Sequence, residues 1–543
     1  MKGFKKSIRR FTSLTLAALT AVSLSVSAFA DEPYESYNYD NWEEAIPSQS
    51  AYTVKDVIGG DYMGLARLSD PTVPLFYSEE ASDSLSEAKD FYVYNNEELW
   101  IADTGNSRIL RLDSDYQLIG CYYTVTGTSE MDSLATTEDG TATYFNEPQG
   151  LFVTTSPSTG KLTLYVADYS NSRVVRASVD SETELTLEQE YVKPDAALYT
   201  SETFNPSKVL VDAAENVYTV VKSVNTGSVQ FEADGTFTGF FGANRVEVTA
   251  SVIVQNLWRK IASNEQISGM TRNVPVEYAN FDIDSDGFIY TVTEVSTDTN
   301  AVKKVNPAGY NIWDNSVGDE YNFGDYTTSV YDAATSTTYS TKLTDIAVND
   351  DGLINVLDYE TGRVFQYDRL ANLICIFGTT TSSADQAGAF SSPNAVEMFG
   401  DDVIVLEGSK TRNDITIFKR TTFGENLHTA FAYYDEGLYL EAVPYWNEVL
   451  ERDGGYVYAY IGLGKADLKN NDYEAALDKF ETVYDRDDYD KAFEYYRNEW
   501  LEKHFTAIAV VIIVLVVLLF VRWILKRKGI KLIKRKKKQK EAD

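Results

Sequence analysis

Short runs of alternating apolar and polar residues fill most of residues 51–422, and turn-forming residues separate the runs. Alternation with a period of two predicts half-buried β-strands, because successive side chains of a strand face opposite sides of a sheet. Three runs end in Asp and are followed, five residues after that Asp, by an Arg that opens a second apolar run: LWIAD (99–103), LYVAD (164–168) and INVLD (354–358). The pattern therefore predicts a β-hairpin that the chain repeats.

Polar residues at fixed places mark each hairpin. Between the Asp and the Arg stand TGNS, YSNS and YETG, whose Gly, Asn and Ser residues favour a tight reversal of the backbone. We expect the Asp carboxylate to accept hydrogen bonds from turn amides while it faces the Arg. Because these residues recur, a role in shaping turns is favoured over a catalytic role, which stays open for the first two hairpins. The residues are Asp103, Asn106, Arg108, Asp168, Asn171, Arg173, Asp358 and Arg363.

Weaker copies of the hairpin complete a series of six units. One such sheet cannot bury both of its faces alone, so the units are expected to pack side by side in a ring. The sixth unit lacks an outer strand, and AYTVKDVIGG (51–60) could supply that strand and close the ring. Each unit is expected to contain four short strands, at residues 84–123, 144–180, 203–242, 277–313, 342–378 and 390–420.

The order Asp, turn, Asn, Arg resembles the blades of NHL-repeat proteins. The resemblance covers about 370 residues; it is good in the first, second and fifth units and degraded in the other three. It implies a mainly β fold, with a six-bladed NHL-type β-propeller over residues 51–422. Residues 249–270 are expected to form a helix inserted between blades, which the family pattern lacks.

From about residue 427 the apolar pattern changes to a helical one. Several positions repeat after 34 residues, and this period resembles the tetratricopeptide repeat. Residues 427–505 are therefore expected to form tetratricopeptide-like helices, with an unrelated helical hairpin as the alternative. Two repeats are fewer than the roughly three usually needed for stability, and a helix at 490–505 could cap them. The expected core residues are Tyr439, Ala442, Trp446, Tyr473, Ala476 and Phe480.

Both ends of the chain carry targeting patterns. Residues 1–30 begin with basic residues, continue with an apolar stretch and end in Ala-Phe-Ala, which is the order of a secretory signal peptide. Residues 506–525 are predicted to form one transmembrane helix, since about 20 apolar residues span a bilayer. Residues 526–543 contain ten Lys or Arg, which predicts a cytoplasmic tail and an extracytoplasmic location for the rest. A buried helix of a soluble domain is the alternative for each apolar stretch.

The charge of the chain is divided unevenly. The formal net charge is −34, but the basic residues of 1–30, Arg522 and the tail hide a more acidic middle. Residues 31–505 carry 32 Lys or Arg and 80 Asp or Glu, a formal charge of −48. Such a surface repels nucleic-acid phosphates, so a nucleic-acid partner is excluded. Residues 31–50 are acidic and rich in aromatic residues, and they are expected to form a leader that lies against the propeller.

One motif suggests a metal site. In DIDSDG (282–287), Asp282, Asp284 and Asp286 match positions 1, 3 and 5 of a calcium loop. The twelfth position, where such a loop needs a Glu, is Thr293. The similar VNDDG (348–352) in the fifth unit favours an Asp-Gly turn between two strands. Calcium or another divalent ion at the three Asp residues remains the alternative, and no other cofactor is expected.

Residues for nucleophilic chemistry are scarce. The two histidines, His428 and His504, lie outside the predicted propeller, which excludes Ser or Cys triads and histidine-bound zinc from its channel. Cys121 and Cys375 are interpreted as small buried apolar residues, although a disulfide between them stays open.

These features favour a membrane-anchored, extracytoplasmic binding or scaffold protein over an enzyme. The propeller face and the helical groove would recognise proteins or ligands for an envelope or transport complex. The alternative is a metal-dependent, gluconolactonase-like hydrolase, whose acidic and amide side chains would hold an ion in the propeller channel.

Overall fold

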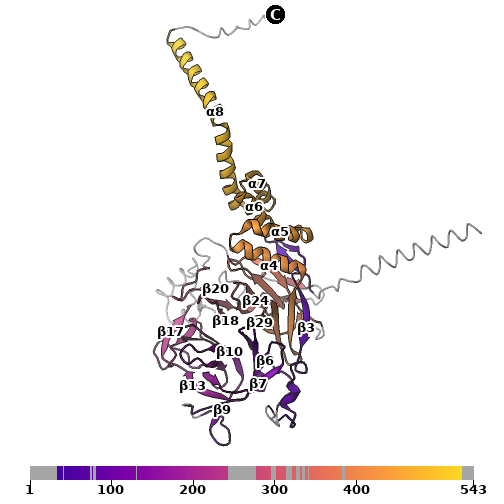
Figure 1. The fold of residues 1–543 in the computed structure, drawn as a ribbon. Coiled ribbons are helices and arrows are strands. Elements are labelled where there is room, and N and C mark those ends of the chain that lie inside the picture. The colour runs from indigo at the N-terminus through magenta and orange to yellow at the C-terminus, as the bar shows by residue number, and fades with distance from the viewer. Residues whose placement is uncertain are drawn as a thin grey trace, which may run out of the picture. The chain divides into compact units, whose positions relative to one another are not determined.

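The computed structural model shows a six-bladed β-propeller followed by a helical region (Figure 1). It describes residues 34–528 except 41, 74–75, 77–80, 130, 132, 243–276, 295–300, 314–320, 326–329, 333–336, 340 and 382–385. The predicted signal peptide, the insert at 249–270 and most of the basic tail lie outside these residues. Contacts divide the chain into two compact units: the propeller, with residues up to Phe431, and the helices from Ala432 onward together with residues 40–44.

Five of the six blades contain four antiparallel strands, and every blade begins with the strand nearest the propeller axis. The first blade has β4 (Asp90–Tyr94), β5 (Glu98–Asp103), β6 (Arg108–Asp113) and β7 (Leu118–Tyr122). The second has β10 (Pro148–Thr155), β11 (Leu162–Asp168), β12 (Arg173–Val179) and β13 (Leu185–Val192), extended by β8 (Thr124–Thr126) and β9 (Ala142–Tyr144). The third has β14 (Pro206–Val211), β15 (Val217–Val221), β16 (Ser228–Phe231) and β17 (Phe237–Phe241).

The fourth blade differs from the prediction of four strands. Within the described residues it has β18 (Tyr278–Ile283), β19 (Ile289–Thr293) and β20 (Val302–Val305). After β20 the chain turns back and pairs with it through a single bridge between Val305 and Asn311. The Asn311 side chain accepts the hydrogen bond from the Lys304 amide at 3.2 Å, so a side chain occupies a place that a fourth strand would fill.

The last two blades bring the ends of the propeller sequence together. The fifth has β23 (Leu343–Val348), β24 (Ile354–Asp358), β25 (Arg363–Tyr367) and β26 (Leu373–Phe377), and the sixth has β29 (Pro393–Phe399), β30 (Asp402–Gly408), β31 (Asn413–Arg420) and β3 (Tyr52–Ile58). Strand β3 is antiparallel to β31, with Tyr52 opposite Arg420 and Ile58 opposite Ile415. The prediction that residues 51–60 complete the sixth blade is confirmed. The inner strands β29 and β4 also contact each other, which closes the ring.

The hydrophobic core lies between neighbouring blades. Trp100 and Tyr122 of the first blade pack with Leu164 and Val175 of the second, and comparable clusters fill the other interfaces. Each sheet therefore buries its faces against two neighbours, as the sequence pattern requires. Shorter pairs of strands lie outside the blades: β1 (Tyr37–Tyr39) with β2 (Ala45–Pro47), β21 (Val330–Asp332) with β22 (Thr337–Tyr339), and β27 (Thr379–Thr380) with β28 (Ala389–Phe390).

The leader is held by side chains of the fifth and sixth blades. Tyr34 is buried, and its hydroxyl donates a hydrogen bond to the Tyr52 carbonyl at 2.8 Å. Tyr37 and Tyr39 both donate to the Asp325 carboxylate, and the Arg363 guanidinium lies over the Tyr37 ring at 5.1 Å.

Ring closure rests partly on the buried Tyr52 hydroxyl. It accepts a hydrogen bond from the Gln366 amide at 3.1 Å and lies 3.2 Å from His428 Nε2. We expect Tyr52→Phe to lower the free energy of unfolding by about 1–3 kcal/mol, because both partners stay buried without it. Urea unfolding checks this value. Tyr94→Phe is the matched control, since that hydroxyl makes its hydrogen bond to Thr155 at an exposed site and should cost less.

Five helices follow the propeller: α4 (Thr422–Asp435), α5 (Tyr439–Arg452), α6 (Val457–Lys469), α7 (Tyr473–Thr482) and α8 (Arg486–Arg527). Consecutive helices from α5 to α8 pack against each other. Of the expected core residues, Ala442, Trp446, Ala476 and Phe480 are fully buried, whereas Tyr439 and Tyr473 are half-buried. One helix in the described part of the chain, α8, contains a segment long and apolar enough to cross a membrane, and none of that segment is buried within the protein.

Two glycines of α6 admit the bulky side chains of α5 and α7. A Cβ atom on Gly462 would lie 2.2 Å from the Trp446 indole nitrogen, and one on Gly464 would lie 2.6 Å from the Phe480 ring. We expect Gly462→Val to destabilise the helical unit by about 1–3 kcal/mol through overpacking. Gly454→Ala is the control, since its Cβ would meet nothing closer than 3.8 Å. Thermal unfolding followed by far-UV circular dichroism distinguishes them; equal shifts would contradict this packing.

Candidate functional site at the propeller axis

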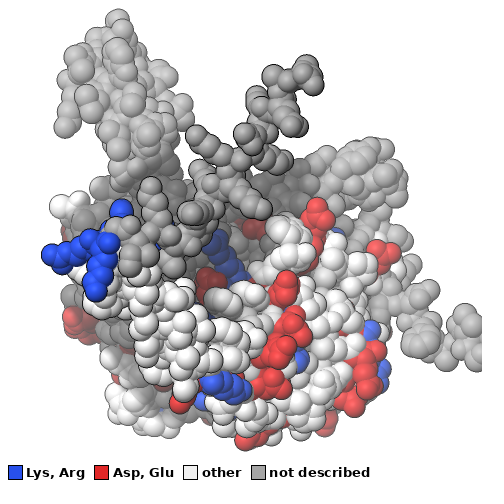
Figure 2. Space-filling view, turned by 90° about the horizontal axis from the view of Figure 1, so that it is seen from above, with Lys and Arg blue, Asp and Glu red and all other residues white. Residues whose placement is uncertain are grey.

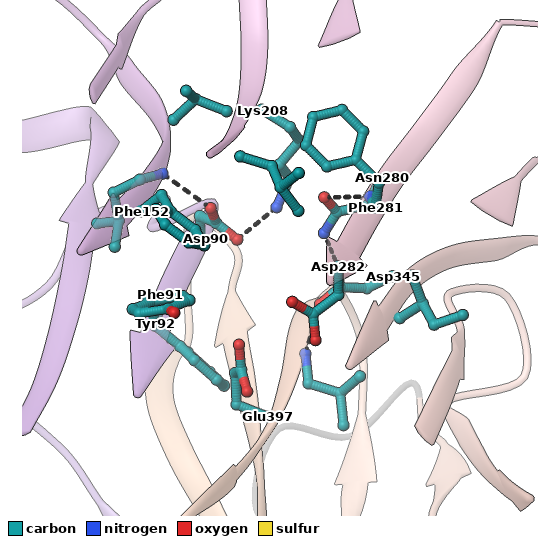
Figure 3. A pocket seen from close by; sticks show the side chains of 15 residues that line it. Asp90, Phe91, Tyr92, Phe152, Lys208, Asn280, Phe281, Asp282, Asp345 and Glu397 are labelled. Atoms are coloured by element: carbon teal, nitrogen blue, oxygen red, sulfur yellow. Dashed lines mark hydrogen bonds and ion pairs between the residues drawn. The ribbon is translucent and has the colours of Figure 1, made fainter. Parts of the chain in front are cut away.

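Polar side chains meet at the centre of the propeller (Figure 3). They come from the first strands of the blades, in which every second side chain points toward the axis. Six of these residues carry the polar groups of a shared cavity: Asp90 of β4, Lys208 of β14, Asn280 and Asp282 of β18, Asp345 of β23 and Glu397 of β29.

The axial cavity is small. The space open to the centre of a water molecule is about 30 Å³, which accommodates about two or three waters. A sugar or a lactone ring needs far more room than this. The enclosed part of the cavity therefore has room for water or a small ion.

Most of the carboxylates at the axis hold neighbouring blades together. Asp90 accepts the backbone N–H of Leu151 at 3.0 Å, which links the first blade to the second. Asp282 accepts that of Val348 at 2.7 Å and links the fourth blade to the fifth. Asp345 likewise accepts the N–H of Val396 at 2.7 Å and links the fifth blade to the sixth. Buried backbone N–H groups at these inner edges need partners, and the carboxylates supply them.

Two further contacts cross the cavity. Lys208 forms an ion pair with Asp90, and the Asn280 side-chain amide donates a hydrogen bond to Asp345 (Figure 3). Burial alone would lower the pKa of Lys208, but Asp90 and Asp345 raise it above its usual value and keep the ammonium charged. One cation thus stands among four carboxyl groups.

Burial and the excess of carboxyl groups raise the pKa values of the acidic side chains at the axis. Burial raises the pKa of Asp282 to about 7 and that of Asp345 to about 7. Burial and then the nearby Asp282, Asp345 and Asp90 carboxylates raise the pKa of Glu397 well above its usual range. The axial cluster therefore retains protons near neutral pH, and its members titrate together.

The repeated Asp, Asn and Arg residues form buried ion pairs in the first two blades. Arg108 Nε donates to Asp103 at 2.7 Å, and Asn106 donates to the same carboxylate at 2.8 Å. Asp103 also accepts the Ser86 N–H at 2.8 Å. The second blade repeats this arrangement through Asp168, Asn171 and Arg173, with both side-chain bonds at 2.8 Å. All four charged side chains are fully buried, which fits a structural role.

In the fifth blade Asp358 faces Arg363 across the β24–β25 pair, as expected, but the two do not form the ion pair seen in the first two blades. Arg363 instead forms an ion pair with Asp325 at 2.7 Å. Asp358 accepts backbone N–H groups from Lys342 at 2.9 Å and Glu360 at 3.0 Å. The expected turn hydrogen bonds and the facing arrangement of this pair are therefore present, while Asp325 lies close enough to bind the guanidinium.

The three Asp residues of the calcium-like motif do not converge. Asp284 closes the β18–β19 turn by accepting the N–H groups of Asp286 at 3.1 Å and Phe288 at 2.8 Å, while Asp282 faces the axis. Asp286 is exposed. Among the residues that the structure describes, no group of three or more His, Cys, Asp or Glu side chains is placed to hold a metal ion.

Among the described residues that line the axial cavity there is no histidine, serine or cysteine. His428 is buried beside Tyr52, and burial lowers its pKa well below the usual range. Cys121 and Cys375 are free and buried, which confirms their interpretation as small apolar residues. Burial raises the pKa of Cys121 to about 11, so its thiol stays protonated at neutral pH.

Sequence reasoning missed the axial cluster. The available signal was a polar residue at an inward-facing place of five of the six inner strands, as in DFYVY (90–94), SKVLV (207–211) and TDIAV (344–348). Alternation alone does not distinguish an axis-facing residue from a solvent-facing one. The signal can therefore be recognised only after the inner strand of each blade has been placed in the ring.

Comparisons with known proteins show no family for this chain. No protein-family model matches the chain, and no curated protein matches it. Solved propellers match at low identity. A Bacteroides thetaiotaomicron protein of unknown function is 12% identical, with a TM-score of 0.37 over 63% of this chain and 71% of that one. Staphylococcus aureus virginiamycin B lyase is 10% identical, with a TM-score of 0.34 over 61% and 94%. Aldose sugar dehydrogenase of Streptomyces coelicolor is 12% identical, with a TM-score of 0.33 over 62% and 95%.

Proposed function

We propose that the chain is a membrane-anchored, extracytoplasmic binding or scaffold protein. Its NHL-like propeller and its tetratricopeptide-like helices would recognise proteins or ligands for an envelope or transport complex. The observation that carries this proposal is the axial cavity, whose enclosed part has room for water or a small ion and whose carboxylates serve mainly to join blades. The outer surfaces are then the places left for recognition.

The two ends of the chain support the location. A secretory signal peptide over residues 1–30, a transmembrane helix over 506–525 and a basic tail would leave the propeller outside the cell. The metal-dependent hydrolase has no support from the site, because the described side chains form no metal-binding group.

The helical unit supports a recognition role through its packing. Lys465 of α6 lies between Tyr434 of α4 and Asp488 of α8, with its ammonium 4.6 Å from the Tyr434 ring centre and 3.4 Å from the Asp488 carboxylate. These contacts join α4, α6 and α8, which are alternate helices of the unit. Exposed apolar residues lie at the start of α5, where Leu438 is 39% and Leu440 is 44% exposed.

The charge of the surface indicates what kind of partner it suits. Figure 2 shows acidic side chains more widely spread than basic ones on the face in view. Residues 31–505 carry a formal charge of −48. We expect the partner to present basic residues and its association rate to fall with rising salt.

Cross-linking of the full-length chain in its native membrane tests the proposal. Two paired variants, Leu438→Glu with Leu440→Glu and Tyr310→Glu with Ile312→Glu, place charges on exposed apolar residues of the helical unit and the propeller. We expect at least one pair to lower recovery of a specific partner by about tenfold while thermal unfolding stays unchanged. Lys193→Gln on the propeller surface serves as a matched exposed control. Equal recovery from the wild type and from a chain-free control would contradict a binding role.

A further inference from the structure

Helix α8 continues without interruption from the helical unit into the predicted membrane span. Residues 505–525 number 21 and extend about 31 Å, which matches the roughly 30 Å hydrocarbon core of a bilayer. At the start of this segment and directly before it lies a group that we call the aromatic collar: Trp500, Leu501, His504 and Phe505. Trp500 is 45%, Leu501 43% and Phe505 69% exposed.

The collar has the residue types and the height of a membrane interface. Trp500 lies about 7 Å above Phe505 along the helix, and the polar headgroup layer of one leaflet is about 5–7 Å thick. The Trp500 and His504 rings stack with centroids 4.5 Å apart. Aromatic rings with one polar edge favour this layer, where the ring meets lipid chains and the N–H meets headgroups.

The four collar residues lie on one side of helix α8. At about 100° per residue, Trp500 and Phe505 point about 140° apart. A helix that packs against one protein surface buries a stripe about 100° wide or more, so such a surface would also cover most of this arc. The accessibility of the collar to lipid-soluble and water-soluble reagents therefore distinguishes a lipid layer from a protein partner.

We infer that the aromatic collar lies in the headgroup layer of the leaflet on the propeller side and sets the height of the helical unit above the membrane. This inference rests on the proposed membrane anchor. Ala492, which is buried in the cluster that α8 shares with α7, is eight residues or about 12 Å above Trp500. At the other end, Arg527 lies 5.3 Å from the Trp523 ring, so a second aromatic and basic group marks the opposite leaflet.

Spin labelling of the full-length protein in phosphatidylcholine–phosphatidylglycerol vesicles tests this placement. Single cysteines replace Glu494, Trp500, Leu501, His504, Phe505 and Leu515, while the buried Cys121 and Cys375 give the unlabelled background. Collision with oxygen reports lipid exposure, and collision with a water-soluble nickel chelate reports water exposure. We expect full chelate access at Glu494, none at Leu515, and intermediate values at all four collar positions that fall steadily from Trp500 to Phe505.

Two results would overturn the inference. Labels at Trp500 and His504 shielded from both reagents, beside chelate-accessible labels at Leu501 and Phe505, would show a protein or a second copy on one face. Chelate access at all four positions equal to that at Glu494 would place the collar in water. The proposed anchor fails separately, if the label at Leu515 also meets the chelate or the protein does not float with the vesicles.

Discussion

Replacing Arg108 by Leu is expected to lower the free energy of unfolding by about 3–5 kcal/mol, because it leaves a buried carboxylate without its cation. Burial already raises the pKa of Asp103, and Arg108 opposes that shift. The substitution also removes the donor that Arg108 offers to the Ser82 and Ser84 carbonyls at 2.8 and 3.0 Å. Urea unfolding of the full-length protein in detergent, followed by tryptophan fluorescence, measures the loss.

Two further variants separate charge from volume. Arg111 lies on the same strand and pairs with Glu98, but both side chains are partly exposed, so Arg111→Leu should cost about 1 kcal/mol or less. Asp103→Asn combined with Arg108→Leu removes the buried charge and should recover part of the lost stability. If Arg108→Leu cost no more than Arg111→Leu, or if the double variant were no better than Arg108→Leu, the buried pair would not act as described.

Raising the pH from 6.5 to 8.5 is expected to destabilise the propeller through its axial cluster. The pKa values of Asp282 and Asp345 rise from an ordinary value of 3.8 in the unfolded chain to about 7 in the folded protein. The folded state therefore binds more protons than the unfolded state between these values. The stabilising effect of the protonated Asp282 and Asp345 is complete below about pH 4 and is lost as the pH rises through 7. Each of these carboxyl groups contributes a slope of at most about 1.4 kcal/mol per pH unit below pH 7, and the slope falls to zero above that value, so most of the change is expected between about pH 6.5 and 7.5.

The pH window avoids an opposing group. His428 has a lowered pKa because of burial, so it reduces stability only below the ordinary histidine value of 6.5. Asp345→Asn should flatten the slope above pH 6.5, whereas Asp286→Asn, at an exposed turn, should leave the slope unchanged. Urea midpoints at several pH values supply the measurement. Stability that is constant or rises from pH 6.5 to 8.5 would contradict protons held at the axis.

The local sequence pattern was sufficient to predict much of the propeller. The Asp–turn–Arg hairpins depend on residues within six positions of one another, and both the buried pair of Asp103 and Arg108 and that of Asp168 and Arg173 follow from that spacing. The closing strand was also predictable, because the last blade lacked one strand and residues 51–60 had the alternation of one.

Features that depend on distant segments were not predictable in the same way. The ion pair of Arg363 could not be read from local spacing, because Asp325, 38 residues upstream of Arg363, binds the guanidinium. The axial cluster escaped notice for a related reason: its carboxylates come from inner strands of four blades, and their shared environment exists only after the ring closes. The period of two shows which residues share a face but not which face lines the axis.

The central claim, an acidic propeller held outside the cell by one membrane helix, is tested most directly by labelling intact cells with a membrane-impermeant maleimide. Glu202→Cys places a thiol on an exposed loop of the propeller, and Gln539→Cys places one in the basic tail, while Cys121 and Cys375 are buried. We expect Cys at position 202 to react in intact cells and Cys at position 539 to react only after permeabilisation. The reverse pattern, or labelling of both only after permeabilisation, would contradict the account.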